Sequence, residues 1–212
     1  MTNINIECDM KRPALAPPPS EPVMLHACCA PCSSAIVEWM LAHGVRPVIY
    51  YYNPNIYPYD EYARRRDESR RHVEAQGLPW VEGPYDHGAW LDAVRGLEGE
   101  PERGSRCLRC FMMRLRRSAL AAKEMGCGCL TTTLASSRWK SLEQIDEAGA
   151  WAERETGVTF WRQNWRKDGL SERRAALLRE FAFYNQLYCG CEFSMRNGAT
   201  ARASKDGGEV RP

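Results

Sequence analysis

Short apolar runs alternate with longer stretches of helical character through the middle of the chain. Apolar runs lie at Val23 to Leu25 and at Val45 to Tyr52, and the stretch between them, Ser33 to His43, is followed by Gly44. A glycine directly after a helical stretch is typical of a helix end. These segments therefore predict a strand–helix–strand unit with parallel strands.

The alternation continues beyond this unit. The pattern predicts helices over Tyr59 to Gln76 and about Leu108 to Met125, strands near Trp80 to Glu82 and over Cys129 to Leu134, and a helical stretch from Ala175 to Leu187. Strands that alternate with helices favour a parallel sheet covered on both faces. We therefore expect one α/β domain over residues 23–196.

The two ends of the chain differ from this pattern. Residues 1–22 are rich in proline, and residues 197–212 are mainly small or charged. Segments of this composition bury too little apolar surface to fold, so both are predicted to be disordered tails. Cys8 lies in the first tail and is discounted as a site residue.

Composition narrows the class of protein. Hydrophobic residues make up 44% of the 212 residues and charged residues 26%, as in a packed globular domain. No apolar run approaches the roughly 18 residues of a membrane span, and the first residues lack the apolar stretch of a signal peptide. A cytoplasmic protein without membrane contact is expected. The net charge of +2 does not by itself indicate nucleic acid.

The ten cysteines are the main anomaly of the composition. Cytosolic thiols stay reduced, so dense cysteine there indicates metal or redox chemistry rather than structural disulfides. Cys28, Cys29 and Cys32 fall where the first strand gives way to a helix, and Cys107 and Cys110 open a later helix. Because a helix N-terminus favours anions, these thiols are expected to ionise easily and to bind metal.

Polar residues follow the other predicted strands. Ligands of parallel sheets bind beyond the carboxyl ends of the strands, where the loops converge. One pocket is expected to gather the three cysteines of the first loop, Asn53 and Asn55 of the second, and Ser136, Ser137 and Lys140 of a third.

Several interpretations of the cysteines compete. Cys29 and Cys32 have the spacing of a thioredoxin-like redox pair, but Cys28 beside them fits that motif poorly. A zinc ribbon would need its two pairs closer than the 75 residues between Cys32 and Cys107. Five thiolates on converging loops can hold an iron–sulfur cluster, the interpretation preferred here. Cys127 and Cys129 are taken as buried small residues.

A third group, Cys189-Gly190-Cys191, has one residue between its thiols. These thiols could act as ligands, as a dithiol electron carrier or as a strained disulfide, and the sequence leaves the three roles open.

Motifs in a fixed order resemble the QueH family of epoxyqueuosine reductases, the cobalamin-independent type, over most of residues 24–195. The motifs are His26-Ala-Cys-Cys-Ala-Pro-Cys32, Tyr52-Asn-Pro-Asn-Ile-Tyr-Pro58, Glu61-Tyr62 followed by arginines, Glu102-Arg-Gly104 before Arg106-Cys107 and Cys110, Thr131-Thr-Thr-Leu134 with Ser137 and Lys140, and Tyr188-Cys-Gly-Cys191. The chain departs from the family at Asn185, where arginine is usual, and at Arg138, where proline often follows the serine.

The resemblance implies a HUP-like domain that reduces the epoxide of epoxyqueuosine in the tRNA anticodon, the last step of queuosine biosynthesis. It also implies a 4Fe–4S cluster with an adjacent mononuclear iron, fed by an electron donor that the sequence does not identify. We expect Cys28, Cys29, Cys107 and Cys110 to be metal ligands, with Cys32 as a further candidate.

Catalytic and RNA-binding roles follow as further expectations. Asp86, Cys189 and Cys191 are candidate catalytic residues, although Asp86 could equally ligate iron or cap a helix. Contacts with tRNA are expected from Asn53, Asn55, Tyr57, Tyr62, Arg114, Arg117 and Lys140.

Two rival functions stay open at this point. An ATP-dependent tRNA sulfur transferase would need a glycine-rich phosphate loop where Cys28 to Cys32 lie. The other rival is a zinc-stabilised RNA-binding module without catalysis.

Overall fold

The computed structural model describes residues 17–195, and the predicted tails lie largely outside these residues. Five parallel strands form one sheet in the order β3-β2-β1-β4-β5. The strands are β1 (Val23–Ala27), β2 (Val48–Tyr51), β3 (Trp80–Glu82), β4 (Cys129–Thr132) and β5 (Thr159–Phe160). The predicted α/β class with a parallel sheet is confirmed.

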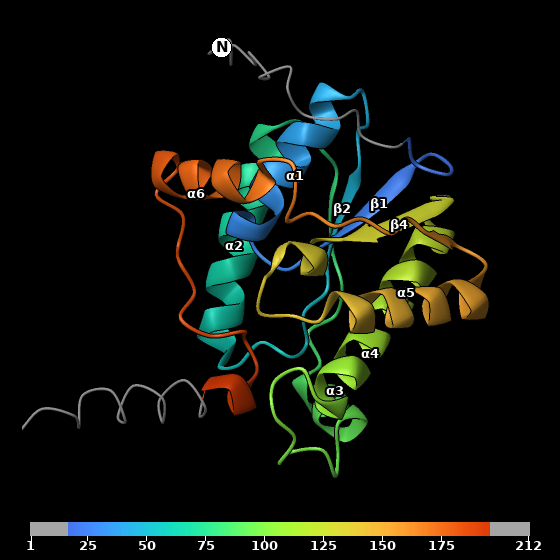
Figure 1. Cartoon of the computed structure of the whole chain (residues 1–212), viewed down its shortest axis with the longest axis vertical. Coiled ribbons are helices and arrows are strands. Elements are labelled where there is room, and N and C mark those ends of the chain that lie inside the picture. The colour runs from blue at the N-terminus through green and yellow to red at the C-terminus, as the bar shows by residue number, and fades with distance from the viewer. Residues whose placement is uncertain (1–16, 196–212) are drawn as a thin grey trace, which may run out of the picture.

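Helices cover both faces of the sheet (Figure 1). They are α1 (Ala30–Ala42), α2 (Tyr59–Ala75), α3 (His87–Ala93), α4 (Ser105–Glu124), α5 (Leu142–Thr156) and α6 (Leu170–Glu180), with a 3-10 turn η1 (Thr133–Ser136) after β4. Helix α1 packs with α2 and α6 on one side, and α4 packs with α5 on the other. None of the helices in the described residues is long and apolar enough to cross a membrane.

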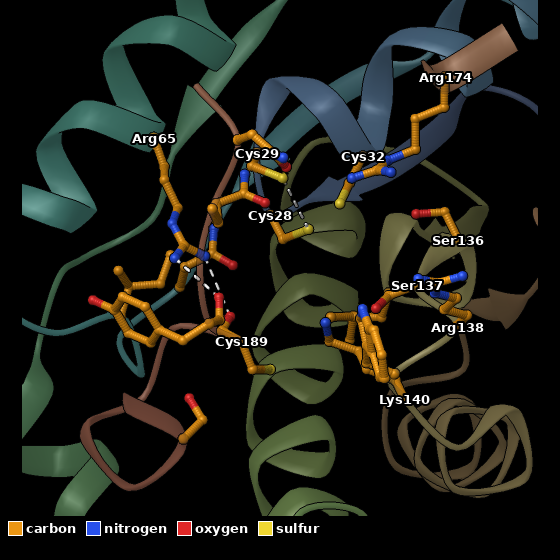
Figure 2. A pocket seen from close by; sticks show the side chains of 18 of the residues that line it. Cys28, Cys29, Cys32, Arg65, Ser136, Ser137, Arg138, Lys140, Arg174 and Cys189 are labelled. Carbon is orange, nitrogen blue, oxygen red and sulfur yellow. Dashed lines mark hydrogen bonds between the residues drawn. The ribbon is translucent and has the colours of Figure 1, made fainter. Parts of the chain in front are cut away.

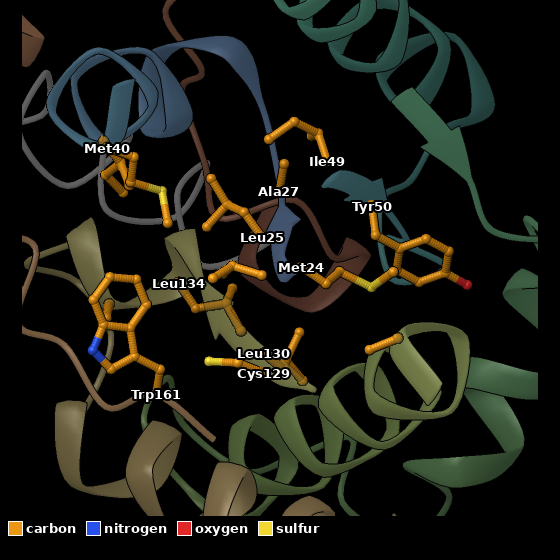
Figure 3. Close-up of a cluster of buried hydrophobic side chains, with 14 of the residues drawn as sticks. Met24, Leu25, Ala27, Met40, Ile49, Tyr50, Cys129, Leu130, Leu134 and Trp161 are labelled. Atoms are coloured by element: carbon orange, nitrogen blue, oxygen red, sulfur yellow. The ribbon is translucent and has the colours of Figure 1, made fainter. Parts of the chain in front are cut away.

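The core lies on both sides of the central strands β1 and β4. Figure 3 shows Met24, Leu25, Leu130 and Leu134 packed together with side chains of the covering layers. All residues of β1 are buried, which explains why its sequence is a continuous apolar run rather than an alternating one.

His26 is the polar exception in β1. Its Nε2 lies 3.0 Å from the carbonyl oxygen of Tyr52, and its Nδ1 lies 2.8 Å from the hydroxyl of Thr132. Burial, together with the charge of Arg114, lowers the pKa of His26 to about 3. The imidazole is therefore neutral, and it links the ends of three neighbouring strands.

Two helices begin earlier than predicted, which matters for the thiols. Helix α1 begins at Ala30 with Pro31 in its first turn, where the fixed φ of proline suits a helix and no amide hydrogen is needed. Helix α4 begins at Ser105, so Cys107 and Cys110 lie within its first two turns.

Other elements also differ from the predicted pattern. Strand β4 ends at Thr132, whose hydroxyl accepts a hydrogen bond from the amide of Leu134 and starts the η1 turn. Helix α6 ends at Glu180, and Ala182 has a left-handed φ of 48° that the predicted longer helix would not allow. The pattern gave no prediction for α5 and β5.

Candidate active site

A cavity of about 920 Å³ lies at the carboxyl ends of β1 and β4, where the strand order reverses. The cysteine loop after β1, the asparagine loop after β2 and the serine–lysine loop after β4 all line it, as the sequence predicted. Helix α6 and the segment that follows it complete the wall. The topology thus gathers polar segments that are far apart in the sequence.

Three thiols are grouped at one end of this cavity (Figure 2). The Sγ atoms of Cys28, Cys29 and Cys32 all lie within 4.8 Å of one another, with 3.8 Å between those of Cys28 and Cys29. Cys29 is the extended N-cap of α1, and the helix then brings Cys32 back beside it. We call these three residues the thiol triplet.

Thr133 fixes the triplet to the η1 turn, which follows the neighbouring strand β4. Its Oγ1 accepts a hydrogen bond from the amide of Cys28 at 3.1 Å and donates to the Cys28 sulfur at 3.3 Å. The triplet therefore spans the point where the strand order reverses.

The charges in the triplet are unequal. Hydrogen bonds from Cys29 and Cys32, with the nearby charge of Lys140, hold the pKa of Cys28 well below its ordinary value. Burial raises the pKa of Cys29 far above its ordinary value, and the hydrogen bond to Cys28 raises the pKa of Cys32. One thiolate shared among three sulfurs, beside a cation, is a donor set suited to a thiophilic metal.

Lys140 supplies the cation. Burial lowers its pKa, but the negative charge on the neighbouring cysteine sulfurs outweighs burial and raises it above the ordinary value. Lys140 and Cys189 line the cavity opposite the triplet (Figure 2).

The remaining candidate cysteines form a second thiol group. Cys107, Cys189 and Cys191 line a small hollow beside the main cavity together with Lys140, and Cys110 packs against Cys191. Burial raises the pKa of Cys107 to about 12 and also raises that of Cys191. All nine cysteines of residues 17–195 are free thiols.

The five cysteines predicted to bind metal are thus divided between two thiol groups. Within the described residues, the triplet is the one group of three or more ligand-type side chains close enough to share an ion. Cys107 and Cys110 lie instead with the Cys189-Gly190-Cys191 segment, because α4 presents its first turns to the segment after α6.

A buried ion pair holds that segment in place. Arg65 donates to Glu61 at 2.5 and 2.8 Å within α2, and it donates to the carbonyl oxygens of Cys189 at 3.2 Å and Tyr188 at 3.4 Å. The hydroxyl of Tyr184 donates to the other oxygen of Glu61 at 2.9 Å.

Gly190 meets a spatial requirement in the same segment. Its φ of 134° is a conformation that residues with side chains rarely adopt, and an added Cβ would lie 3.2 Å from Ile56. The glycine between the two thiols is thus a backbone requirement of the site.

Two predicted substrate contacts are part of the cavity wall. Asn53 accepts a hydrogen bond from Arg114 and donates to the carbonyl of Ala27 at 2.9 Å, so the buried Arg114 and Asn53 support each other. Asn55 is 3% exposed, and its Oδ1 has no hydrogen-bond partner in residues 17–195. That oxygen is free to accept from a ligand.

Other predicted residues lie away from the cavity. Tyr62 is 1% exposed, its hydroxyl donates to Glu82 and its ring packs on Tyr51 and Tyr85, so no face is open for a base. Tyr57 is exposed and stacks on His87.

Asp86 and Arg117 also lie outside the cavity wall. The Asp86 carboxylate caps α3 by accepting from the amide of Ala89 at 2.8 Å, which is the capping alternative. Arg117 lies 3.7 Å from Glu124 and lines a separate hollow with Tyr52 and Trp151.

The sequence reasoning missed several residues of the site. Arg65, Arg174 and Gln186 line the cavity, and Gln186 Nε2 is buried without a partner in the described residues. Arg65 lies in a run of arginines whose pattern is that of a solvated helix face, so no local signal separates it from its neighbours.

The chain is similar to proteins of one family over most of its length. A family model described as Epoxyqueuosine reductase QueH matches residues 23–197. Curated proteins named Epoxyqueuosine reductase QueH are similar over most of the chain. The one from Histophilus somni is 44% identical over 176 residues, which is 82% of this chain and 72% of the relative. The one from Acinetobacter baylyi is 40% identical over 190 residues, 89% of this chain and 87% of the relative.

Proposed function

Because the chain belongs to the QueH family of epoxyqueuosine reductases, we propose that it reduces the epoxide of epoxyqueuosine in the tRNA anticodon and so completes queuosine. The observation that carries the proposal is the thiol triplet, largely buried, that faces Lys140 and Cys189 across one cavity. A tRNA substrate implies a cytoplasmic enzyme.

The donor set suits thiolate-bound iron. Cys28, Cys29, Cys107 and Cys110 are the proposed ligands of an iron–sulfur cluster, and Cys32 is a further candidate for an adjacent iron. Bound in this way, the metals would supply single electrons and a Lewis acid for the epoxide oxygen. The cluster ligands would come from both thiol groups, which line adjoining hollows that share Lys140 and Cys189.

The reaction consumes two electrons and two protons. Both carbon–oxygen bonds of the epoxide break, the single bond between the two carbons becomes a double bond, and the oxygen leaves as water. Oxidation of the Cys189 and Cys191 thiols to a disulfide would release the same two electrons and two protons. An external electron donor would then return two electrons and restore the dithiol. Whether these cysteines cycle in this way or act as ligands is decided by the experiment below.

The cavity wall supplies the substrate contacts. Asn55 would accept a hydrogen bond from the modified nucleotide through its unpartnered Oδ1, while Lys140 and Arg114 provide positive charge for the RNA. Asn53 keeps Arg114 in place.

Metal analysis tests the proposal. Anaerobically purified protein should contain iron and acid-labile sulfide, and should convert epoxyqueuosine in tRNA to queuosine when given a low-potential reductant. Alanine at Cys28, Cys29, Cys107 or Cys110 should remove most of the cluster absorbance. Stoichiometric zinc without sulfide would support the non-catalytic RNA-binding module instead.

The double variant Cys189→Ser, Cys191→Ser separates the roles of the last two thiols. If they cycle as a dithiol, activity collapses while the cluster absorbance persists. Loss of the whole cluster would make them ligands, and a parental rate would end any role in turnover.

A further inference from the structure

Two large apolar side chains are left exposed at the cavity. Trp139 is 64% exposed and Leu187 is 65% exposed, the highest values among the large hydrophobic residues of the described chain. Both line the cavity, although they come from different segments, one after η1 and the other after α6. An exposed tryptophan beside a polar cavity is characteristic of a ligand-binding surface.

The backbone that carries Trp139 is held in place. Arg103 donates hydrogen bonds to the carbonyl oxygens of Trp139 at 3.0 Å and Arg138 at 2.9 Å, and the amide of Lys140 donates to Ser137 at 3.1 Å. The following residue, Lys140, faces the thiols (Figure 2). The indole therefore extends from a fixed loop while its side chain stays open to solvent.

The surroundings of Trp139 carry positive charge. The Arg138 guanidinium lies 4.8 Å from the centre of the indole ring, a cation–π contact. Six cationic side chains line the cavity against a single carboxylate, Glu102. These cations are Arg65, Arg114, Arg138, Lys140, Arg166 and Arg174. Arg65 and Arg114 are buried and bonded to Glu61 and Asn53, so the other four cations are the ones left to contact RNA. An exposed aromatic ring beside such cations is the arrangement that binds unpaired nucleotides by stacking and phosphate contact.

We propose that Trp139 stacks on a nucleobase that flanks the modified nucleotide in the anticodon loop, with Leu187 as an apolar contact from the neighbouring segment. The inference rests on the proposed function, because it requires an RNA substrate. The reacting nucleotide must reach the thiols inside the cavity, so its neighbours in the RNA remain at the rim where Trp139 lies. Tyr62, the aromatic residue predicted to contact tRNA, cannot stack in this way because its ring is buried.

Equilibrium binding of an anticodon stem–loop RNA tests this inference without turnover. The probe carries guanosine in place of the modified base, and anisotropy is measured over a range of salt concentrations. Trp139→Ala should weaken binding about 5- to 150-fold, the range for one lost stacked base. The slope of log Kd against log salt should stay parental, because stacking releases no counterions. Trp139→Phe should retain most of the affinity.

Two further variants serve as controls. Arg138→Met should flatten the salt slope by about 0.7 if its charge contacts an RNA phosphate. Met125→Ala removes an apolar side chain that is 43% exposed at the end of α4, away from the cavity, and should bind RNA as the parent does. With tRNA substrate, Trp139→Ala should raise KM and leave kcat unchanged.

Binding of Trp139→Ala within about twofold of the parent would overturn the inference. A fall in kcat at unchanged RNA affinity would also overturn it, because Trp139 would then act inside the cavity. So would a higher concentration of protein electron donor needed for half-maximal rate, because the surface would then bind that protein. Failure of the proposed function has a different signature, since the parent would bind the stem–loop without reducing epoxyqueuosine.

Discussion

Among single residues, Arg65 connects two distant parts of the site. Its guanidinium is nearly buried, and it joins Glu61 in the same helix to the backbone of the Cys189 segment, 124 residues further along the chain. A buried ion pair adds little net stability compared with apolar residues, but loss of one partner leaves the other charge unpaired. The pair therefore fixes the geometry of the second thiol group more than it stabilises α2.

Arg65→Met should lower the free energy of unfolding by about 3 to 5 kcal/mol, because it strands the Glu61 carboxylate. The double variant Glu61→Gln, Arg65→Met should recover a large part of that loss in urea denaturation. The exposed pair of Arg70 and Glu74 has the same spacing in the same helix, so Arg70→Met should cost less than about 1 kcal/mol. Equal costs at the two arginines would contradict the assignment.

At the scale of elements, packing details decide how helices meet the sheet and the chain after α6. Gly149 of α5 lies directly against the ring of Phe160 in β5, and a Cβ at that position would overlap the ring. His72 of α2 lies edge-on to the rings of Phe181 and Phe183, 5.2 and 5.0 Å away. Substitutions at Gly149 and His72 should therefore change the stability of the protein.

Gly149→Ala should destabilise the protein by at least about 1 kcal/mol, although alanine is the better helix former, because the overlap with Phe160 exceeds the gain in helix propensity. Gly88→Ala is the matched comparison, since the nearest atom to its added Cβ is the Asp86 carboxylate at 3.5 Å. Thermal unfolding of the two variants should give shifts of clearly different size, and a stabilised Gly149→Ala protein would refute the argument.

The pH dependence of stability should carry a contribution from His72. Burial lowers its pKa below the ordinary value of 6.5, an effect that Glu38 only partly offsets. Below about pH 6.5 the unfolded chain binds a proton at this residue that the folded chain does not bind. The contribution of neutral, buried His72 to the free energy of unfolding is therefore complete above about pH 6.5 and is lost as the pH falls below that value. His72→Gln should therefore show a shallower loss of stability than the parent between about pH 6.5 and 5. Parallel curves would exclude this role.

On the scale of the whole molecule, the site joins three distant stretches of sequence. The triplet follows β1, the Cys107 pair opens α4, and the Cys189 pair comes after α6. A ligand that binds sulfurs from more than one of these stretches stabilises the folded state over the unfolded chain.

Removal of metal from the holoenzyme under anaerobic conditions should lower its melting temperature and speed amide exchange in residues 100–110 and 181–195. The central strands β1 and β4 should keep their protection, because they are held by the core rather than by the site. Uniform deprotection across the sheet would contradict this division.

The sequence was a good guide to the architecture and to the triplet, and a poor guide to long-range pairing. Apolar runs and glycine stops predicted β1, β2 and α2, because those signals are local. The thiols of Cys28, Cys29 and Cys32 are grouped by their spacing alone. Three features could not be predicted in this way: the thiols that neighbour Cys107, the burial of Tyr62 and the placement of Arg65 at the site. Each depends on tertiary packing or on segments more than fifty residues away in sequence, which the local pattern of residues does not contain.

The site is built from segments that are far apart along the chain, so the ribosome synthesises them at different times. The cysteines of the triplet leave the exit tunnel first, and the Cys107 pair follows with α4. The segment that carries Cys189 and Cys191 is made only after every strand of the sheet. The three cysteines of the triplet are therefore synthesised well before the segments that complete the wall around them.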